Sequence, residues 1–120
     1  MYSAAFIFEA GEYDARFHEL NALIDAVADA TPGFLGRESW RSPDGKKSNA
    51  TYYWESLDAL REFSKQPKHV EAKREYRKWY KGYHVVIAQV LHSYGDGTIE
   101  HITPNERHAR TAPGSLSDPT

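Results

Sequence analysis

The stretch 52–94 constrains the fold most, because it sets an interrupted helical pattern between two strand patterns. Ser56 is a suitable N-cap for the first helical piece. Pro67 is expected to open a second piece, because proline has no amide hydrogen to donate inside a helix. Gly82 is a suitable C-cap for that second piece. Residues 83–94 then form a long apolar run, which predicts a strand whose two faces are both largely apolar.

The chain before this stretch has the pattern of a strand, a helix and a hairpin. The helix carries apolar residues at the spacing of one buried face, and Asp14 is a suitable N-cap. The turn 42–45 combines proline and glycine, which favour a tight reversal. The expected elements are a strand at 3–9, a helix at 14–30, and strands at 34–41 and 48–54. The complete order, β-α-β-β-α-β, predicts a ferredoxin-like α+β unit with an antiparallel sheet and both helices on one face.

The face of this sheet that the helices leave uncovered predicts a partner. Such a sheet normally alternates apolar residues with polar residues that face solvent. The expected strands instead place apolar residues on both faces, among them Phe6, Phe8, Trp54, Val86 and Val90. A second copy of the chain is the simplest cover for an apolar face. We therefore expect a homodimer through the open sheet face, in which two sheets form a dimeric α/β barrel.

Composition limits the classes of function. A chain of 120 residues suits one domain, expected over 1–103 with a last short strand at 98–102, followed by a flexible polar tail at 104–120. The lack of cysteine excludes disulfides and thiolate chemistry, and the net charge of −2 argues against nucleic-acid binding. The sequence has neither a signal peptide nor an apolar run of about 18 residues. We therefore expect a cytoplasmic protein that does not bind membranes.

Several short sequence motifs follow one another along the chain. A Pro-Gly-Phe-Leu-Gly run opens the second strand, an Asp-Gly pair lies in the hairpin turn, and a Tyr-Trp-Glu-Ser run leads into the broken helix. On these motifs residues 3–94 resemble the antibiotic biosynthesis monooxygenase family of dimeric α/β-barrel proteins. The residues that carry the resemblance are 32–36, 44–45, 53–56, 57–60, His69, and Trp79 with Tyr80.

The resemblance implies three alternative functions. The first is a small monooxygenase that acts on an aromatic or polyketide-like molecule and needs no organic cofactor. The second is a haem-binding or haem-degrading protein that uses His69 as the iron ligand. The haem-degrading branch also uses a first-strand asparagine and a second-helix tryptophan, where this chain has Ser3, Ala5 or Ile7 and Phe63. The third is a non-catalytic dimer that binds a small ligand.

The resemblance and the break at Pro67 together predict a pocket between the helices and the sheet. A broken helix cannot lie flush along a twisted sheet, so side chains are expected to flank a gap. His69 is the candidate catalytic residue or metal ligand, and the alternative is a partly exposed histidine near a helix N-terminus. The expected lining residues are Trp54, Phe63, His69, Tyr76 and Tyr80, with Lys65 and Lys68 at the mouth.

The rings and cations of this region also have a purely structural interpretation. Tyr76, Trp79, Tyr80 and Tyr83 fit one helical stripe, which either lines a cavity for a flat small ligand or packs as core. Seven cations within 65–81 either attract an anionic ligand or form a solvated helix face.

Overall fold

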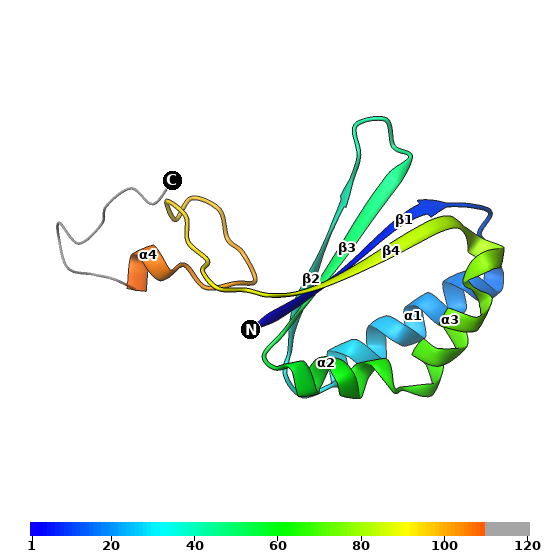
Figure 1. Ribbon diagram of the computed structural model, residues 1–120, viewed down its shortest axis with the longest axis horizontal. Coiled ribbons are helices and arrows are strands. Elements are labelled where there is room, and N and C mark those ends of the chain that lie inside the picture. Colours follow the sequence, from blue (N-terminus) through cyan, green and yellow to red (C-terminus); the bar gives the residue numbers. More distant parts are fainter. Residues whose placement is uncertain (110–120) are drawn as a thin grey trace.

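The computed structural model describes residues 1–109, and it has an antiparallel sheet with helices packed on one face (Figure 1). The predicted tail beyond residue 109 lies outside the described residues. The elements are β1 (Tyr2–Ala10), α1 (Ala15–Ala30), β2 (Phe34–Arg41), β3 (Lys47–Trp54), α2 (Leu57–Ser64), α3 (Pro67–Trp79), β4 (Tyr80–Gln89) and α4 (Glu106–Ala109). This order confirms the predicted ferredoxin-like α+β unit.

The strand order is β2-β3-β1-β4, and all neighbouring strands are antiparallel. Ala4 on β1 lies opposite Tyr52 on β3 and opposite Ile87 on β4. Residues that are opposite across an antiparallel pair share a face of the sheet. The Tyr52 hydroxyl donates to Asp25 Oδ1 of α1 at 3.0 Å, so this row of residues marks the helix-facing side.

Local sequence explains where the helices begin. The side chains of Asp14 and Ser56 cap α1 and α2, as predicted, and accept hydrogen bonds from the amides of Phe17 at 2.8 Å and Ala59 at 3.1 Å. Pro67 is the first residue of α3, where its missing amide hydrogen costs nothing. The predicted break in the helical region is therefore confirmed.

The end of α3 differs from the prediction. The helix ends at Trp79, and Gly82 lies inside β4 instead of capping the helix. The cause is tertiary: the Gly11 amide donates to the Trp79 carbonyl at 2.6 Å, and Ala10 on β1 pairs with Tyr80. These contacts with β1 draw the chain out of the helix before it reaches the glycine.

The C-terminal part of the chain also departs from the prediction. β4 ends at Gln89 and not at residue 94, and residues 98–102 are irregular, with bends in place of the predicted strand. The short helix α4 lies in a segment that was expected to be flexible. Backbone pairing explains the end of β4. Its neighbour β1 begins at the N-terminus, and the last bond between them is from the Val90 amide to the Met1 carbonyl at 3.0 Å. Within the described residues, no other strand pairs with the chain after Val90.

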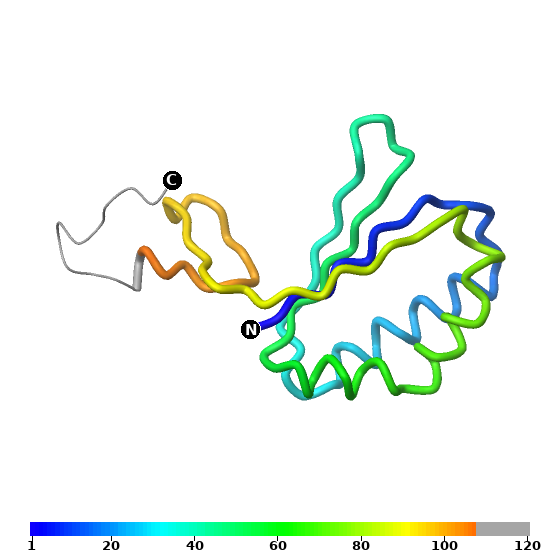
Figure 2. Tube along the Cα trace, viewed as in Figure 1, coloured from blue at the N-terminus to red at the C-terminus, as the bar shows by residue number. Residues whose placement is uncertain are grey.

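Residues 90–107 leave the sheet as an arm that returns to β2 (Figure 2). His101 Nε2 lies 2.8 Å from Glu38 Oε2, and the Thr103 amide donates to His101 Nδ1 at 3.1 Å. A Cβ at Gly36 would lie 3.1 Å from Ile102, so this glycine leaves room for the arm. The arm is therefore fastened to the open side of the β2–β3 hairpin.

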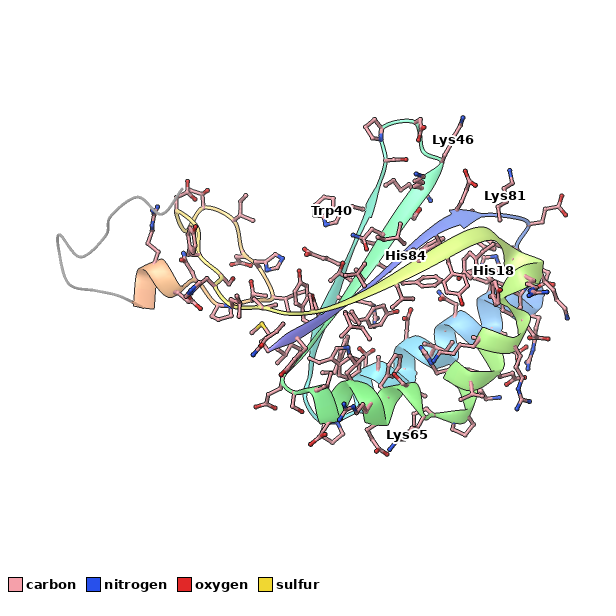
Figure 3. The ribbon with its side chains drawn as sticks, viewed as in Figure 1. His18, Trp40, Lys46, Lys65, Lys81 and His84 are labelled. Carbon is pink, nitrogen blue, oxygen red and sulfur yellow. The ribbon has the colours of Figure 1, made fainter. Side chains whose placement is uncertain are left out.

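The open face of the sheet is more polar than predicted. By register it carries Ala5, Ile7 and Val86 beside polar residues such as Tyr53 and Glu38. The Tyr53 hydroxyl donates to Glu38 Oε1 at 2.8 Å, so these polar groups are paired with each other. Trp40, which projects from the hairpin in Figure 3, is 66% exposed. The face is thus mixed, and the homodimer stays a prediction.

Candidate functional site

Three of the predicted pocket residues form one group in the helix-facing core. Phe63 on α2 lies between Trp54 at the end of β3 and His69 in the first turn of α3, with ring centroids 5.0 Å and 4.8 Å away. Trp54 is fully buried, and Phe63 is 5% exposed. Phe34 and Tyr52 pack against the same group. The structure therefore brings these three residues together, as packed core.

His69 is a neutral imidazole with an unused nitrogen. Burial, and to a smaller extent the nearby Lys73, lower the pKa of His69 to about 4. Its Nδ1 is buried and has no hydrogen-bond partner within residues 1–109, and the same holds for Trp54 Nε1. Buried polar atoms usually have a partner, so these two nitrogens are available to a water or a ligand.

Tyr80 belongs to a second group of rings, around the junction of α3 and β4. Its ring contacts Phe6 and Phe8 at 5.3 Å and 5.0 Å, and Tyr13 and Phe17 at 6.0 Å each. Burial raises the pKa of the Tyr80 phenol far above its ordinary value, so the group stays protonated. This group, unlike the first, borders open space.

Tyr76 reaches the second group through Tyr83, whose ring lies 5.6 Å from that of Phe6. The Tyr76 ring meets that of Tyr83 edge-on at 4.6 Å. The prediction that Tyr76, Trp79, Tyr80 and Tyr83 share one helical stripe is wrong, because α3 ends at Trp79 and the last two residues lie on β4. The two tyrosines meet across the helix–sheet interface.

A small cavity lies between α1, α3 and the start of β4. Its volume is about 40 Å³, and it is lined by Phe17, Leu20, Asn21, Ile24, Ala72, Trp79 and Tyr80. Tyr80 is the only member of the predicted lining set among these residues. The short side chain of Ala72 on α3 leaves the space, and the exposed Asn21 offers an amide that can donate and accept hydrogen bonds.

Sequence reasoning missed most of this lining. The periodicity of α1 could have identified Phe17, Leu20 and Ile24, since they follow its apolar stripe. Nothing local distinguishes Ala72 or Asn21 from other helix residues. Their place at the cavity depends on how α1 and α3 pack together.

The helices leave one edge of the sheet uncovered. Tyr83, Val85 and Ile87 lie on the helix-facing side of β4 by register, yet they are 47%, 47% and 55% exposed. β4 is an edge strand, with β1 as its neighbour. The space between the layers is therefore open toward solvent along β4.

The two lysines expected at the pocket mouth lie on the helical layer. Lys65 caps the end of α2 and points away from the sheet in Figure 3. Lys68 Nζ lies 3.6 Å from Glu71 Oε2, and Glu71 also bonds Arg16 of α1. Lys68 thus belongs to an ion-pair network that ties α3 to α1.

The residues around His69 do not fit haem. Its free nitrogen has the chemistry of an iron ligand, but the Phe63 ring lies against the imidazole, and His69 does not line the cavity described above. A cavity of about 40 Å³ is also far smaller than the roughly 300 Å³ or more of ordinary ligand pockets. Within residues 1–109 no cluster of three or more His, Asp or Glu side chains could hold a metal ion.

Comparison with known proteins identifies the family. The family model described as "Monooxygenase af470-like" matches residues 7–108, which is most of the chain. The chain belongs to the af470-like monooxygenase family. A relative in Bacillus subtilis (strain 168), the uncharacterized protein YqjZ, is 34% identical over 90 residues, which cover 74% of this chain and 78% of YqjZ.

Solved structures show that the chain has the antibiotic biosynthesis monooxygenase fold. SnoaB from Streptomyces nogalater, a cofactor-independent oxygenase, aligns with a TM-score of 0.63 at 18% identity, over 77% of this chain and 94% of SnoaB. A candidate antibiotic biosynthesis monooxygenase from Nitrosomonas europaea aligns with a TM-score of 0.62 at 13% identity, over 77% and 100% of the two chains. The resemblance stated from the sequence is confirmed, and at these identities it concerns the fold. Among the described residues, no helix is long and apolar enough to cross a membrane.

Proposed function

We propose that this member of the af470-like monooxygenase family oxidises an aromatic or polyketide-like small molecule with O₂, and that it needs no organic cofactor. In such a reaction the substrate itself supplies the electrons: an activated CH₂ group becomes C=O, one oxygen atom of O₂ enters the product, and the other leaves as water. The substrate must therefore carry an acidic CH next to a phenol or ketone, so that its carbanion can reduce O₂.

One observation carries the proposal: a monooxygenase-family chain has a ring-walled cavity between its helices and its sheet. The lining is apolar and aromatic, with Asn21 and the protonated Tyr80 phenol as its main polar groups. Such a lining excludes water from a reactive carbanion and can orient a carbonyl or hydroxyl by hydrogen bonds. SnoaB, which has the same fold, is a cofactor-independent oxygenase, and this supports a reaction without flavin or nicotinamide.

The cavity must widen to hold a ring system. At about 40 Å³ it has room for water only. The junction between α2 and α3 offers a hinge, because Gln66 has extended backbone angles and Pro67 donates no hydrogen bond. An outward movement of α3 at this junction would join the cavity to the open edge along β4. We accordingly propose that α3 moves outward to admit the substrate and then closes around it.

His69 has a positioning role in this proposal. With a pKa lowered to about 4 the imidazole is neutral near pH 7 and is a weak base. Its buried Nδ1 can accept a hydrogen bond from a substrate hydroxyl that enters beside Phe63. Trp54, Phe63, His69, Tyr76 and Tyr80 are proposed to line the widened site, and Lys65 and Lys68 to lie outside its mouth.

The proposal includes a homodimer through the open sheet face. Ala5, Ile7 and Val86 would be covered there by a second copy, whereas the paired Tyr53 and Glu38 already satisfy each other. A dimer of this kind leaves the helix-facing site of each subunit free. It is the arrangement that the exposed apolar residues of the face favour.

Oxygen consumption tests the proposal. The purified chain is incubated with anthrone and a series of dihydroxynaphthalenes, with and without added flavin, NADH and EDTA, and O₂ uptake and ¹⁸O incorporation are measured. We expect uptake that is independent of the additives, with one ¹⁸O atom per product. Binding without uptake would favour the non-catalytic ligand-binding alternative. A haem titration with a Soret shift that His69→Ala abolishes would instead establish the haem-binding alternative.

A further inference from the structure

One carboxylate oxygen of Asp14 connects the start of α1 to the end of α3. Asp14 Oδ1 accepts the Phe17 amide at 2.8 Å and also the Trp79 indole Nε1–H at 3.1 Å. The first bond is an ordinary N-cap. The second bond is not needed to begin a helix. It joins the start of α1 to Trp79, the last residue of α3.

Trp79 is fixed at two points by the loop that contains Asp14. Its carbonyl accepts the Gly11 amide at 2.6 Å, and a Cβ at Gly11 would lie 2.9 Å from that same oxygen. Its side chain is 2% exposed, and the ring meets that of Phe17 edge-on at 5.4 Å. The loop therefore determines both the position of the residue and the orientation of its indole.

Trp79 is one of the residues that line the cavity, together with Tyr80 and Ala72. A buried indole N–H without an acceptor is unfavourable, so loss of the Asp14 bond would favour rotation of the ring toward another partner. Rotation of a ring of this size would alter a cavity of about 40 Å³. The acceptor itself lies at the surface, so the bond is a link between the solvent-exposed loop and the inner wall.

We propose that Asp14 is a positioning residue, which holds the Trp79 indole as a wall of the cavity and thereby sets the affinity of the site for its ligand. This inference rests on the proposed function only in assigning the cavity to the ligand. The bond between Asp14 and Trp79 and its effect on the indole are independent of any oxygenase activity.

Two substitutions separate capping from positioning. Serine is a good N-cap, but its hydroxyl is one bond too short to keep the Phe17 amide and reach Trp79 as well, so Asp14→Ser retains the cap and loses the indole bond. Asparagine keeps a carbonyl oxygen at the same place, so Asp14→Asn should retain both bonds. The pair thus distinguishes a positioning role from a purely structural one.

The experiment uses the full chain with 5-fluorotryptophan, which gives one ¹⁹F resonance for each of Trp40, Trp54 and Trp79, assigned by single Trp→Phe variants. The ligand probe is 1-naphthol, titrated by calorimetry. In Asp14→Ser we expect the Trp79 resonance to shift or broaden and the Trp54 resonance to stay. We expect 1-naphthol to bind more weakly, by up to about tenfold, because binding must then restore an indole orientation that one hydrogen bond no longer stabilises. Asp14→Asn should match the wild type.

Further variants keep the proposal open to refutation. Trp79→Phe retains the cap and an aromatic ring but removes the indole N–H. In that background Asp14→Ser should weaken binding no further, since both changes break the same bond.

An unshifted Trp79 resonance with unchanged affinity in Asp14→Ser, or additive losses in the double variant, would overturn the inference. If Asp14→Ser does not fold, full affinity in Trp79→Phe overturns it equally. A wild type that fails to bind 1-naphthol would count against the proposed ligand site, whereas the ¹⁹F comparison would still decide the role of Asp14 at the indole.

Discussion

The imidazole of His69 packs against the ring of Phe63 with centroids 4.8 Å apart and ring planes at 63°. This contact places a titratable side chain in an apolar setting at the break between α2 and α3. It has a measurable consequence for how the protein responds to pH, because the imidazolium form is disfavoured there.

We expect the chain to lose stability as the pH falls from about 6.5 to about 4. The pKa of His69 is about 4 in the folded protein against 6.5 in the unfolded chain, so within this window the unfolded state binds more protons and the free energy of unfolding rises with pH. The loss should be on the order of 2 kcal/mol, less than the full shift gives, because solvent reaches part of the ring. Urea unfolding at several pH values measures it.

His69→Gln should remove most of this pH dependence, whereas His18→Gln is the matched control, because that ring is exposed. An NMR titration that places the pKa of His69 at 6.5 or above would contradict the neutral imidazole on which its proposed role depends.

Removal of the Phe63 ring should destabilise the protein severely. Phe63→Ala leaves a void beside Trp54 and His69, and buried Phe→Ala changes typically cost 3–5 kcal/mol, or about that range here. Denaturant unfolding provides the measurement. Trp40→Ala is the control, since Trp40 is 66% exposed. An equal loss of stability in Trp40→Ala would show that the loss in Phe63→Ala does not result from core packing.

A larger side chain at Ala72 should weaken ligand binding without unfolding the chain. Ala72→Leu adds volume directly into a cavity of about 40 Å³, so 1-naphthol affinity should fall at least about tenfold while the melting temperature changes by only a few degrees. The control is Ala22→Leu on the exposed side of α1. Unchanged binding in Ala72→Leu would mean that the ligand occupies a different site.

Substitution by alanine should destabilise the protein at Gly33 but not at Gly82. Gly33 has φ of +91°, and a Cβ there would lie 2.8 Å from Ala59 Cβ, so Gly33→Ala should cost about 1–3 kcal/mol. Gly82 has no atom within 4 Å of a new Cβ, and Gly82→Ala should change stability by less than about 0.5 kcal/mol. Thermal melts of both variants are the test. A large loss for Gly82→Ala would restore the helix-cap interpretation of that residue.

Adjacent residues of β4 can locate the dimer interface. Val86 lies on the open face and Ile87 on the helix-facing side, and they are 43% and 55% exposed in the single chain. Val86→Glu should convert a dimer to monomers at micromolar concentration, because it buries a charge in the proposed interface, while Ile87→Glu should not. Light scattering distinguishes the two. A wild-type monomer, or the reverse response of the two variants, would refute the open-face dimer.

Much of the fold follows from local sequence. Asp14 and Ser56 cap helices with their own side chains, and Pro67 opens α3, since these effects involve atoms only a few residues apart. The apolar periodicity of α1 and the strand patterns are equally local, so the β-α-β-β-α-β order could be predicted. The proximity of Trp54, Phe63 and His69 could also be predicted, because the strand end and the helix break are neighbours in the chain. The pocket that they were expected to line stays a prediction.

Long-range contacts decided the rest. By sequence, Gly82 is as suitable a helix cap as Ser56. The Gly11 amide, however, donates a hydrogen bond to the Trp79 carbonyl, and α3 ends there, before it reaches Gly82. The paired Tyr53 and Glu38 make the open face more polar than strand composition suggests, because their bond crosses two strands.

The sequence by itself determined the elements, their order and the family resemblance, because helix caps, prolines and apolar spacing act over a few residues. The tertiary structure alone decided that the cavity lies beside Ala72 and Tyr80, and that Asp14 is bound to the Trp79 indole. A cavity is the volume that side chains of separate elements fail to fill. Its position therefore depends on how α1, α3 and β4 pack, which no single segment of the chain encodes.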